Sequence, residues 1–208
     1  AEIAFPGQVD EDGVPIPNRI FEDQESQRFN AGVNLNYFYD RAVNKEFKDI
    51  DIFLNNFQQS LYQLQHAKFP VVSCPSGLAI GGGYEVISQT SFIAAHSNSV
   101  LGLVESLVGL IPAGGGCKEM LRRWANHSDI KNDPKQLTLK VFNLIGYATT
   151  ADSPIKAKAQ QFLGEQDIMV MSKDRLIEEA DKLIFSNKEN YHPLDSASFS
   201  LPGSTVMS

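Results

Sequence analysis

This sequence has few cysteines, a negative net charge and no long apolar run. Only Cys74 and Cys117 occur among 208 residues, without the spacing of a disulfide framework or a metal site. The formal net charge is -7 and no cluster of Lys and Arg stands out, which argues against a nucleic-acid-binding face. No apolar run approaches the roughly 18 residues of a membrane helix, and residues 1–13 lack the features of a signal peptide. We therefore expect a cytoplasmic protein with no metal, no nucleic-acid partner and no membrane contact.

The sequence does contain alternating helical and extended patterns. Apolar spacing, or an N-cap followed by proline, predicts helices over 50–66, 134–145, 154–163 and 173–185. Gly164 is the expected stop of the third helix, and Ser172 is a candidate cap of the fourth. Short apolar segments predict strands over 69–80, 91–95, 99–105 and 167–171. Because strands and helices alternate, the fold class is α/β.

The stretch "GLAIGGGYE" (77–85) places consecutive glycines just before a glutamate. A dinucleotide fingerprint would need a glycine where Val86 stands, a phosphate-binding loop would need a following Lys and Ser or Thr, and the G-x-S-x-G nucleophile elbow is absent. An oxyanion hole remains, because glycines at a strand-to-helix turn leave backbone N–H groups free to face a ligand. A tight turn that only packs the helix onto the strand is the more common explanation of glycines alone.

Two glutamates beside glycine turns strengthen the catalytic interpretation. Glu105 lies between Leu103, Val104, Leu107 and Val108, where a buried carboxylate is costly without a partner or a task. A salt-bridged or surface glutamate would explain either residue alone. Glu85 and Glu105 together, each near a glycine-rich turn, are harder to explain in that way.

Three segments carry a resemblance to a known family: "FNAGVNL" (29–35), "PVVSCPSGLAIGGGYE" (70–85) and "LGLVESLVGLIPAGGG" (101–116). In order and separation they resemble signatures of the crotonase (enoyl-CoA hydratase/isomerase) superfamily, over roughly residues 19–186. The residues of these segments are most similar to the subgroup in which this domain forms the C-terminal part of a bifunctional 3-hydroxyacyl-CoA dehydrogenase/enoyl-CoA hydratase. The resemblance implies a crotonase-type ββα superhelix. The family places two strands and a helix before the first turn, whereas residues 1–31 are rich in proline and acid, so we expect a fold short of its N-terminal strands, with a helical C-terminal region.

The resemblance also implies roles for particular residues. Glu85 and Glu105 would be catalytic, holding one water between them, with Glu105 the better candidate for protonating C2. The amides of Val33 and Gly82 would form the oxyanion hole for the thioester oxygen. The substrate-binding residues would be Val33, Asn34, Leu35, Asn36, Gly82 and Ala113, the amide of the last helping to place the water. Tyr84, where the family often has a smaller residue, would narrow the site.

The implied activity is the reversible hydration of trans-2-enoyl-CoA to 3-hydroxyacyl-CoA in fatty-acid β-oxidation. Double-bond isomerisation, which needs only the Glu105 base, is one alternative, and a non-catalytic acyl-CoA-binding or assembly module is another, favoured by the short N-terminal region. No cofactor is expected in this chain. NAD would be expected only if an upstream dehydrogenase domain exists. The expected partners are the acyl-CoA substrate and either further copies of the chain in a homo-oligomer or a fused or associated dehydrogenase domain. We expect four parts along the chain. Residues 1–18 would be an irregular arm and residues 19–125 the crotonase core with the oxyanion hole and the glutamates. Residues 126–186 would be a C-terminal helical region and residues 187–208 an extended tail.

Overall fold

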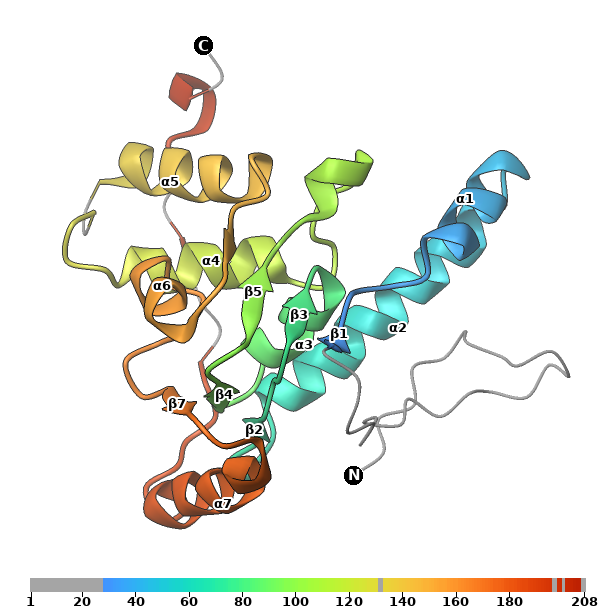
Figure 1. Ribbon diagram of the computed structural model, residues 1–208. Coiled ribbons are helices and arrows are strands. Elements are labelled where there is room, and N and C mark those ends of the chain that lie inside the picture. Colours follow the sequence, from blue (N-terminus) through green and yellow to red (C-terminus); the bar gives the residue numbers. More distant parts are fainter. Residues whose placement is uncertain (1–27, 131–132, 196–197, 200, 207–208) are drawn as a thin grey trace, which may run out of the picture.

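The computed structural model describes residues 28–130, 133–195, 198–199 and 201–206. The arm expected over 1–18 and residues 19–27 of the predicted core therefore lie outside the described residues. The described part is a mixed α/β fold with two sheets and helices packed around them, which confirms the predicted fold class (Figure 1).

The larger sheet has four strands in the order β1-β3-β5-β6. Their bounds are Arg28–Asn30, Leu78–Ile80, Val100–Gly102 and Thr150–Ala151. The strands pair in parallel except for β5 with β6, which is antiparallel. Parallel pairing requires crossover connections, and here the helices between successive strands supply them. As a result, the ends of β1, β3 and β5 come side by side.

The smaller sheet has three parallel strands in the order β2-β4-β7. They span Val72–Ser73, Phe92–His96 and Ile168–Val170. Helix α7 (Leu176–Asn187) packs on this sheet through Leu176, which contacts a buried cluster with Ala94 and Val170. Residues 126–186 thus contribute helices and also one strand to each sheet.

The remaining helices fall into two groups (Figure 1). Helices α3, α4, α5 and α6 gather around the larger sheet and span Gly82–Ser88, Gly116–Ala125, Pro134–Gly146 and Pro154–Ala159. Helices α1 and α2, over Leu35–Val43 and Phe47–Gln65, form an arm that extends away from the sheets. Short 3-10 helices η1, η2 and η3 cover Glu105–Val108, Lys173–Arg175 and Gly203–Val206.

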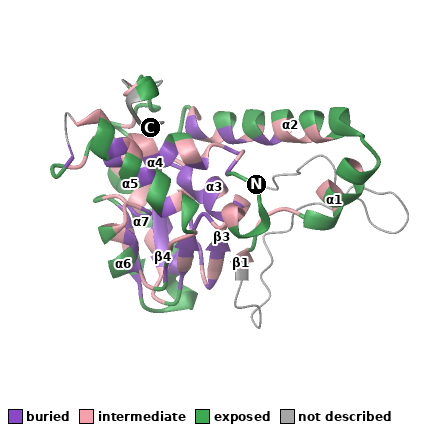
Figure 2. Ribbon diagram, turned by 90° about the horizontal axis from the view of Figure 1, so that it is seen from above, coloured by how far each residue is buried: buried purple, intermediate pink, exposed green. Residues whose placement is uncertain are grey.

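Burial follows this division (Figure 2). The main core joins residues of both sheets to α3, α4, α5, α6 and the segment after α6, among them the fully buried Leu101, Met120 and Phe162. Helix α2 buries Phe57 and Leu61, which are four residues apart and so share one face near the core. Helix α1 has no buried residue. The core side of the molecule is therefore buried, and the side made by α1 and α2 is largely exposed.

Several predicted elements are confirmed. The helix predicted over 50–66 is α2, and the helix predicted from Pro134 is α5, whose cap Asp133 accepts hydrogen bonds from two backbone amides at 3.1 and 2.9 Å. The strands predicted over 91–95, 99–105 and 167–171 are β4, β5 and β7 with shorter bounds. In these segments apolar pattern and capping act in the same direction, so local sequence is sufficient.

Other predictions were wrong at their boundaries. Residues 69–80 form two strands rather than one, since Gly77 (φ 73) turns the chain from the smaller sheet into the larger. Helix α6 ends at Ala159, before the predicted stop at Gly164. Gln161, which lies between these two residues, takes a positive φ of 60, which is not a helical conformation. Ser172 makes no side-chain cap, because a 3-10 turn precedes α7. None of the helices in the described ranges is both long and apolar enough to cross a membrane.

Candidate active site

The turn between β3 and α3 brings bare backbone to the centre of the site. Gly81 adopts φ 56, a left-handed conformation that favours glycine, and its N–H donates to the carbonyl of Gly102 at 2.9 Å. A methyl group built on Gly81 would lie 3.3 Å from Oε1 of Glu105. Conformation and close approach therefore both require glycine here, and the turn places Gly82 as the first residue of α3.

The second turn follows β1 and lies against the first. Gly32 has φ 101, and its N–H donates to Oδ1 of Asn30 at 2.7 Å. A methyl group built on Gly82 would lie 3.5 Å from Cα of Gly32 and 3.7 Å from the amide nitrogen of Val33. The structure thus brings together the two residues predicted to form the oxyanion hole. Outside helices and strands, no backbone hydrogen bond recorded for the described residues uses the amide of Val33 or of Gly82.

Glu85 is held on the other side of α3's first turn. Its side chain is buried, with 3% exposed, and Oε1 accepts a hydrogen bond from the Gly116 amide at 2.8 Å. The pKa of Glu85 is raised from 4.5 to about 7. Burial is the largest cause, the Gly116 amide opposes it, and the negative charge of Glu105 raises the pKa further. Near neutral pH this carboxyl can therefore either accept or donate a proton.

Glu105 is the first residue of η1, and Leu103 and Val104 separate it from the end of β5. It is half-buried, and Oε2 is shielded from solvent with no hydrogen-bond partner among the described residues. Burial raises its pKa, against the effect of nearby backbone amides. The expected apolar enclosure is only partly right, because Leu103 is buried but Leu107 and Val108 are exposed. An unpartnered buried carboxylate oxygen is unusual in a folded protein and is typical of a functional position.

The charge of Glu105 acts on Glu85, and both glutamates act on a common neighbour. Each has a raised pKa, and the charge of Glu105 is one of the causes for Glu85. The Cys117 thiol, in the first turn of α4, has a pKa raised by burial and then by the charges of both glutamates. A thiol in such surroundings stays protonated, so Cys117 is not suited to be a nucleophile. Two carboxyls with raised pKa values beside one turn are candidates for general acid–base chemistry.

The other predicted substrate-binding residues lie at the edge of the site. Asn34 caps α1, and its Oδ1 accepts from the Asn36 amide at 3.0 Å, while Leu35 is 45% exposed. These residues follow Val33 directly and so border the turn of Gly32 and Val33 on its exposed side. Ala113 lies in the loop before α4, where its carbonyl accepts a hydrogen bond from the Gln58 side chain at 2.6 Å. The role predicted for the Ala113 amide stays a prediction.

The glycine loop before α4 contributes more than the sequence indicated. The Gly116 amide donates to Glu85. A methyl group built on Gly114 would lie 2.2 Å from the Phe57 ring and 2.7 Å from Oε2 of Glu85, so this position has room only for glycine. The run of three glycines was visible in the sequence, but its contact with Glu85 depends on tertiary packing.

The expectation that Tyr84 narrows the site is wrong. Its side chain is fully buried, its hydroxyl donates to the carbonyl of Phe162 at 3.0 Å, and the two rings meet edge to face. Because successive helical residues point in different directions, Tyr84 faces the core while Glu85 faces the glycine loop. Within the described ranges, no group of three or more His, Cys, Asp or Glu could hold a metal ion.

Comparison with known proteins agrees with this geometry. The profile of the enoyl-CoA hydratase/isomerase family matches residues 20–132. A Bacillus subtilis protein named "Probable 3-hydroxyacyl-CoA dehydrogenase" is 31% identical over 87% of this chain and 23% of its own length. A Rickettsia felis protein, whose name describes a fatty acid oxidation complex trifunctional enzyme, is 32% identical over 79% of this chain and 22% of its own. The chain thus spans less than a quarter of these curated relatives.

Solved structures support the fold. An enoyl-CoA hydratase from Bacillus anthracis superposes with a TM-score of 0.59 and 22% identity, covering 77% of this chain and 55% of that one. An enoyl-CoA hydratase from Polaromonas sp. JS666 gives a TM-score of 0.60 and 20% identity, covering 78% and 56%. The profile match spans more than half of the chain and includes the turn of Val33, the turn of Gly82 and both glutamates. The chain belongs to the enoyl-CoA hydratase/isomerase family.

Proposed function

We propose that the chain catalyses the reversible hydration of a trans-2-enoyl-CoA to a 3-hydroxyacyl-CoA in fatty-acid β-oxidation. The observation that carries the proposal is one cluster of groups: two carboxyls with raised pKa, the buried Glu85 and the half-buried Glu105, next to the paired turns of Val33 and Gly82. Isolated buried acids are often structural, but acids whose pKa values are raised beside available backbone donors match the needs of this reaction.

The first requirement of the reaction is to stabilise negative charge on the thioester oxygen. When water adds to C3, the π electrons of the C2–C3 double bond move towards C2 and the carbonyl, forming an enolate. The amides of Val33 and Gly82 would donate hydrogen bonds to that oxygen, and Gly82 adds the positive end of α3. Fixed donors of this kind typically change kcat by ~10²–10³ each.

The second requirement is proton transfer on both sides of the double bond. Glu85 and Glu105 would hold one water, whose oxygen bonds to C3 while one of its protons passes to the ionised Glu85. Glu105 would then give its proton to C2, collapsing the enolate to the product. The glutamates exchange protonation states in this cycle, and proton exchange with solvent restores them. A base with a pKa of about 7 suits this exchange at neutral pH.

Double-bond isomerisation is the second candidate, and one contrast between the glutamates favours it. Glu85 is fixed by the Gly116 amide, whereas Oε2 of Glu105 has no partner in the described part of the chain. A single base could move a proton along an enoyl-CoA without adding water. Hydration needs both acids, so the two reactions differ in their dependence on Glu85.

The experiment measures hydration of crotonyl-CoA and isomerisation of a 3-enoyl-CoA by the same set of variants. Glu85→Gln and Glu105→Gln should each lower hydration by ~10²–10⁴. Glu178→Gln, an exposed position on α7, is the matched control and should leave both rates unchanged. If Glu85→Gln kept hydration at the wild-type rate, hydration by this pair would be excluded. Loss of hydration with retained isomerisation in Glu85→Gln would assign the isomerase step to Glu105 alone.

The curated relatives suggest a wider setting for this activity. Because the chain spans less than a quarter of their length, we propose that it acts as the hydratase part of a larger unit with a 3-hydroxyacyl-CoA dehydrogenase. In that unit the product would be oxidised by a separate domain that binds NAD. Assembly through a fused domain or through further copies of the chain is part of the same proposal.

A further inference from the structure

One face of α2 contacts the glycine loop beside the candidate site. Phe57 and Leu61 on this face are buried, and Gln58 and Gln65 supply its polar groups. Positions 58, 61 and 65 recur at helical spacing, so their side chains lie on one side of the helix. The hydration mechanism gives no role to this face, although it lies against the loop that binds Glu85.

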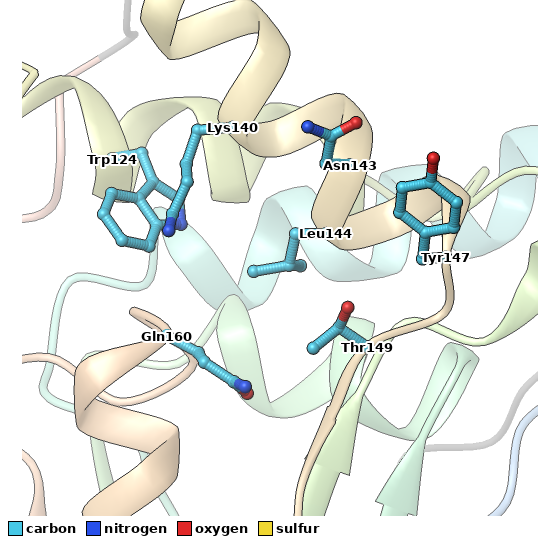
Figure 3. A pocket seen from close by; sticks show the side chains of 7 residues that line it. All are labelled: Trp124, Lys140, Asn143, Leu144, Tyr147, Thr149 and Gln160. Atoms are coloured by element: carbon cyan, nitrogen blue, oxygen red, sulfur yellow. The ribbon is translucent and has the colours of Figure 1, made fainter.

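The C-terminal end of α2 is fixed to α4. Gln65 Nε2 donates to Oε1 of Glu119 at 2.6 Å, and the fully buried Glu119 also pairs with Arg122 at 2.7 Å. Buried carboxylates need such partners, so this contact holds the two helices together. Trp124, further along α4, lines an open pocket towards α5 and α6 that shares no residue with the α2 contact (Figure 3). Gln58 therefore extends from a helix whose position is fixed by a separate contact.

Gln58 reaches the glycine loop directly. Its Nε2 donates to the carbonyl oxygen of Ala113 at 2.6 Å, between residues 55 positions apart. The Ala113 carbonyl and the Gly114 N–H belong to one peptide unit, which is planar and trans, so they point in opposite directions. A hydrogen bond that fixes this carbonyl therefore also fixes the direction of the N–H.

The Gly114 backbone lies against the carboxyl of Glu85. A methyl group built on Gly114 would lie 2.7 Å from Oε2 of Glu85, while Oε1 accepts from the Gly116 amide at 2.8 Å. Burial raises the pKa of Glu85, and the amides of Gly116, Gly114 and Gly115 each oppose that rise. The loop thus favours the ionised form of Glu85 through several backbone donors, one of which belongs to the peptide that Gln58 holds.

Two titratable groups face Glu85 from other elements. The charge of Glu105, at the start of η1, raises the pKa of Glu85 further. Cys117 of α4 stays protonated, because burial and then both glutamates raise its pKa. Gln58 is neutral, so its replacement by another neutral residue leaves these charges unchanged.

We propose that Gln58 is a positioning residue for Glu85, acting through the peptide between Ala113 and Gly114. Its amide holds the Ala113 carbonyl and so directs the Gly114 N–H at the carboxylate, which stabilises the ionised form. The catalytic consequence rests on the proposed function, in which the ionised Glu85 accepts a proton from water. The effect on the ionisation of Glu85 does not depend on that reaction.

Carboxyl-carbon NMR titration compares the wild type with Gln58→Met and Gln59→Met. Methionine matches glutamine in length and helix propensity but has no side-chain N–H donor. Gln59 is the matched control, because it is the neighbouring exposed glutamine and points to a different side of α2. The pKa of Glu85 should rise by roughly 0.4–1 pH unit in Gln58→Met, the equivalent of one hydrogen bond, and stay at the wild-type value in Gln59→Met. An unchanged value in Gln58→Met would mean that water replaces the amide of Gln58, and the proposal would be wrong.

The backbone amides of the loop give a second readout that a general loss of packing would not produce. In the wild type and in Gln59→Met, the amide shifts of Gly114 and Gly116 should follow the titration of Glu85. In Gln58→Met the response of Gly114 should become smaller while that of Gly116 is kept. Equal losses at both amides, or an unchanged response of Gly114, would contradict orientation through this peptide.

Kinetic measurements distinguish a failure of this inference from a failure of the proposed function. In the hydration of crotonyl-CoA, the acid limb of the kcat profile should move to higher pH in Gln58→Met by the same amount as the pKa of Glu85, with KM unchanged. Thermal unfolding checks that both variants fold. A wild type without hydratase activity would refute the proposed function, and the NMR titrations would still test Gln58. An active wild type whose two NMR readouts are matched by Gln58→Met would overturn the inference alone.

Discussion

Replacing Glu85 by Gln should make the protein more stable at alkaline pH while removing the proposed catalytic base. The carboxyl is buried with 3% exposed, and its pKa is raised from 4.5 to about 7 mainly by that burial. Because the folded pKa lies above the unfolded value, the protonated form stabilises the fold below about pH 4.5. This contribution is lost as the pH rises through about 7.

The size of the effect follows from the pKa difference. A rise from 4.5 to about 7 corresponds, at about 1.36 kcal/mol per pH unit, to roughly 3 kcal/mol once the carboxyl is ionised in both states. At pH 5 the cost is below about 1 kcal/mol, because the folded carboxyl is still protonated. Glutamine has the same shape, is neutral at both pH values, and its carbonyl oxygen can still accept from the Gly116 amide.

Thermal unfolding of wild type and Glu85→Gln at pH 5 and pH 8 tests this reasoning. At pH 8 the variant should unfold roughly 10 °C higher, since a domain of this size shifts by about 2–4 °C per kcal/mol. At pH 5 the two melting temperatures should differ by no more than about 3 °C. A variant that is less stable at pH 8, or equally stabilised at both pH values, would show that burial of the carboxylate does not determine its pKa.

Three further outcomes are expected at neighbouring positions. Gly114→Ala should cost about 1–3 kcal/mol of unfolding free energy and reduce turnover, because the added methyl meets the Phe57 ring and the Glu85 carboxylate; unchanged stability would contradict the packing. Tyr84→Phe should cost about 1 kcal/mol in denaturant unfolding without changing KM, since its hydroxyl pairs with a buried main-chain carbonyl and does not line the site. Glu105→Gln should lower the pKa of Glu85, because it removes the nearby negative charge, and carboxyl-carbon NMR titration would show no change if the two groups do not interact.

The local part of this fold could be predicted from the sequence, and the tertiary part could not. Asp133 followed by Pro134 gives the start of α5 because a cap and a proline act within one turn. The segment 69–80 was predicted as one strand because its residues are uniformly apolar or small. Only the assembly of two sheets shows that the chain leaves one and enters the other at Gly77. Helix α1 was not predicted. Leu35, Phe38 and Ala42 fall at helical spacing, but the helix has only 9 residues, none of them buried, and it packs against α2 rather than on the core.

The candidate site shows the same limit. Motif order was enough to select Glu85, Glu105, Val33 and Gly82, and the structure places the two turns in contact. The hydrogen bond from the Gly116 amide to Glu85 could not be read from the sequence, because the residues are 31 positions apart and meet only through the packing of α3 against α4. Resemblance therefore selected the candidate groups, and the structure gave their partners and the causes of their pKa values.

The central claim is that a CoA thioester binds with its carbonyl oxygen between two backbone amides and its double bond between two glutamates. The most direct measurement is a crystal structure of the protein with acetoacetyl-CoA, whose enolate resembles the charge that develops in hydration. The account predicts a thioester oxygen about 2.7–3.1 Å from the amide nitrogens of both Val33 and Gly82, with C2 and C3 facing Glu85 and Glu105. A thioester oxygen bound away from either amide, or acyl carbons that meet neither glutamate, would contradict it.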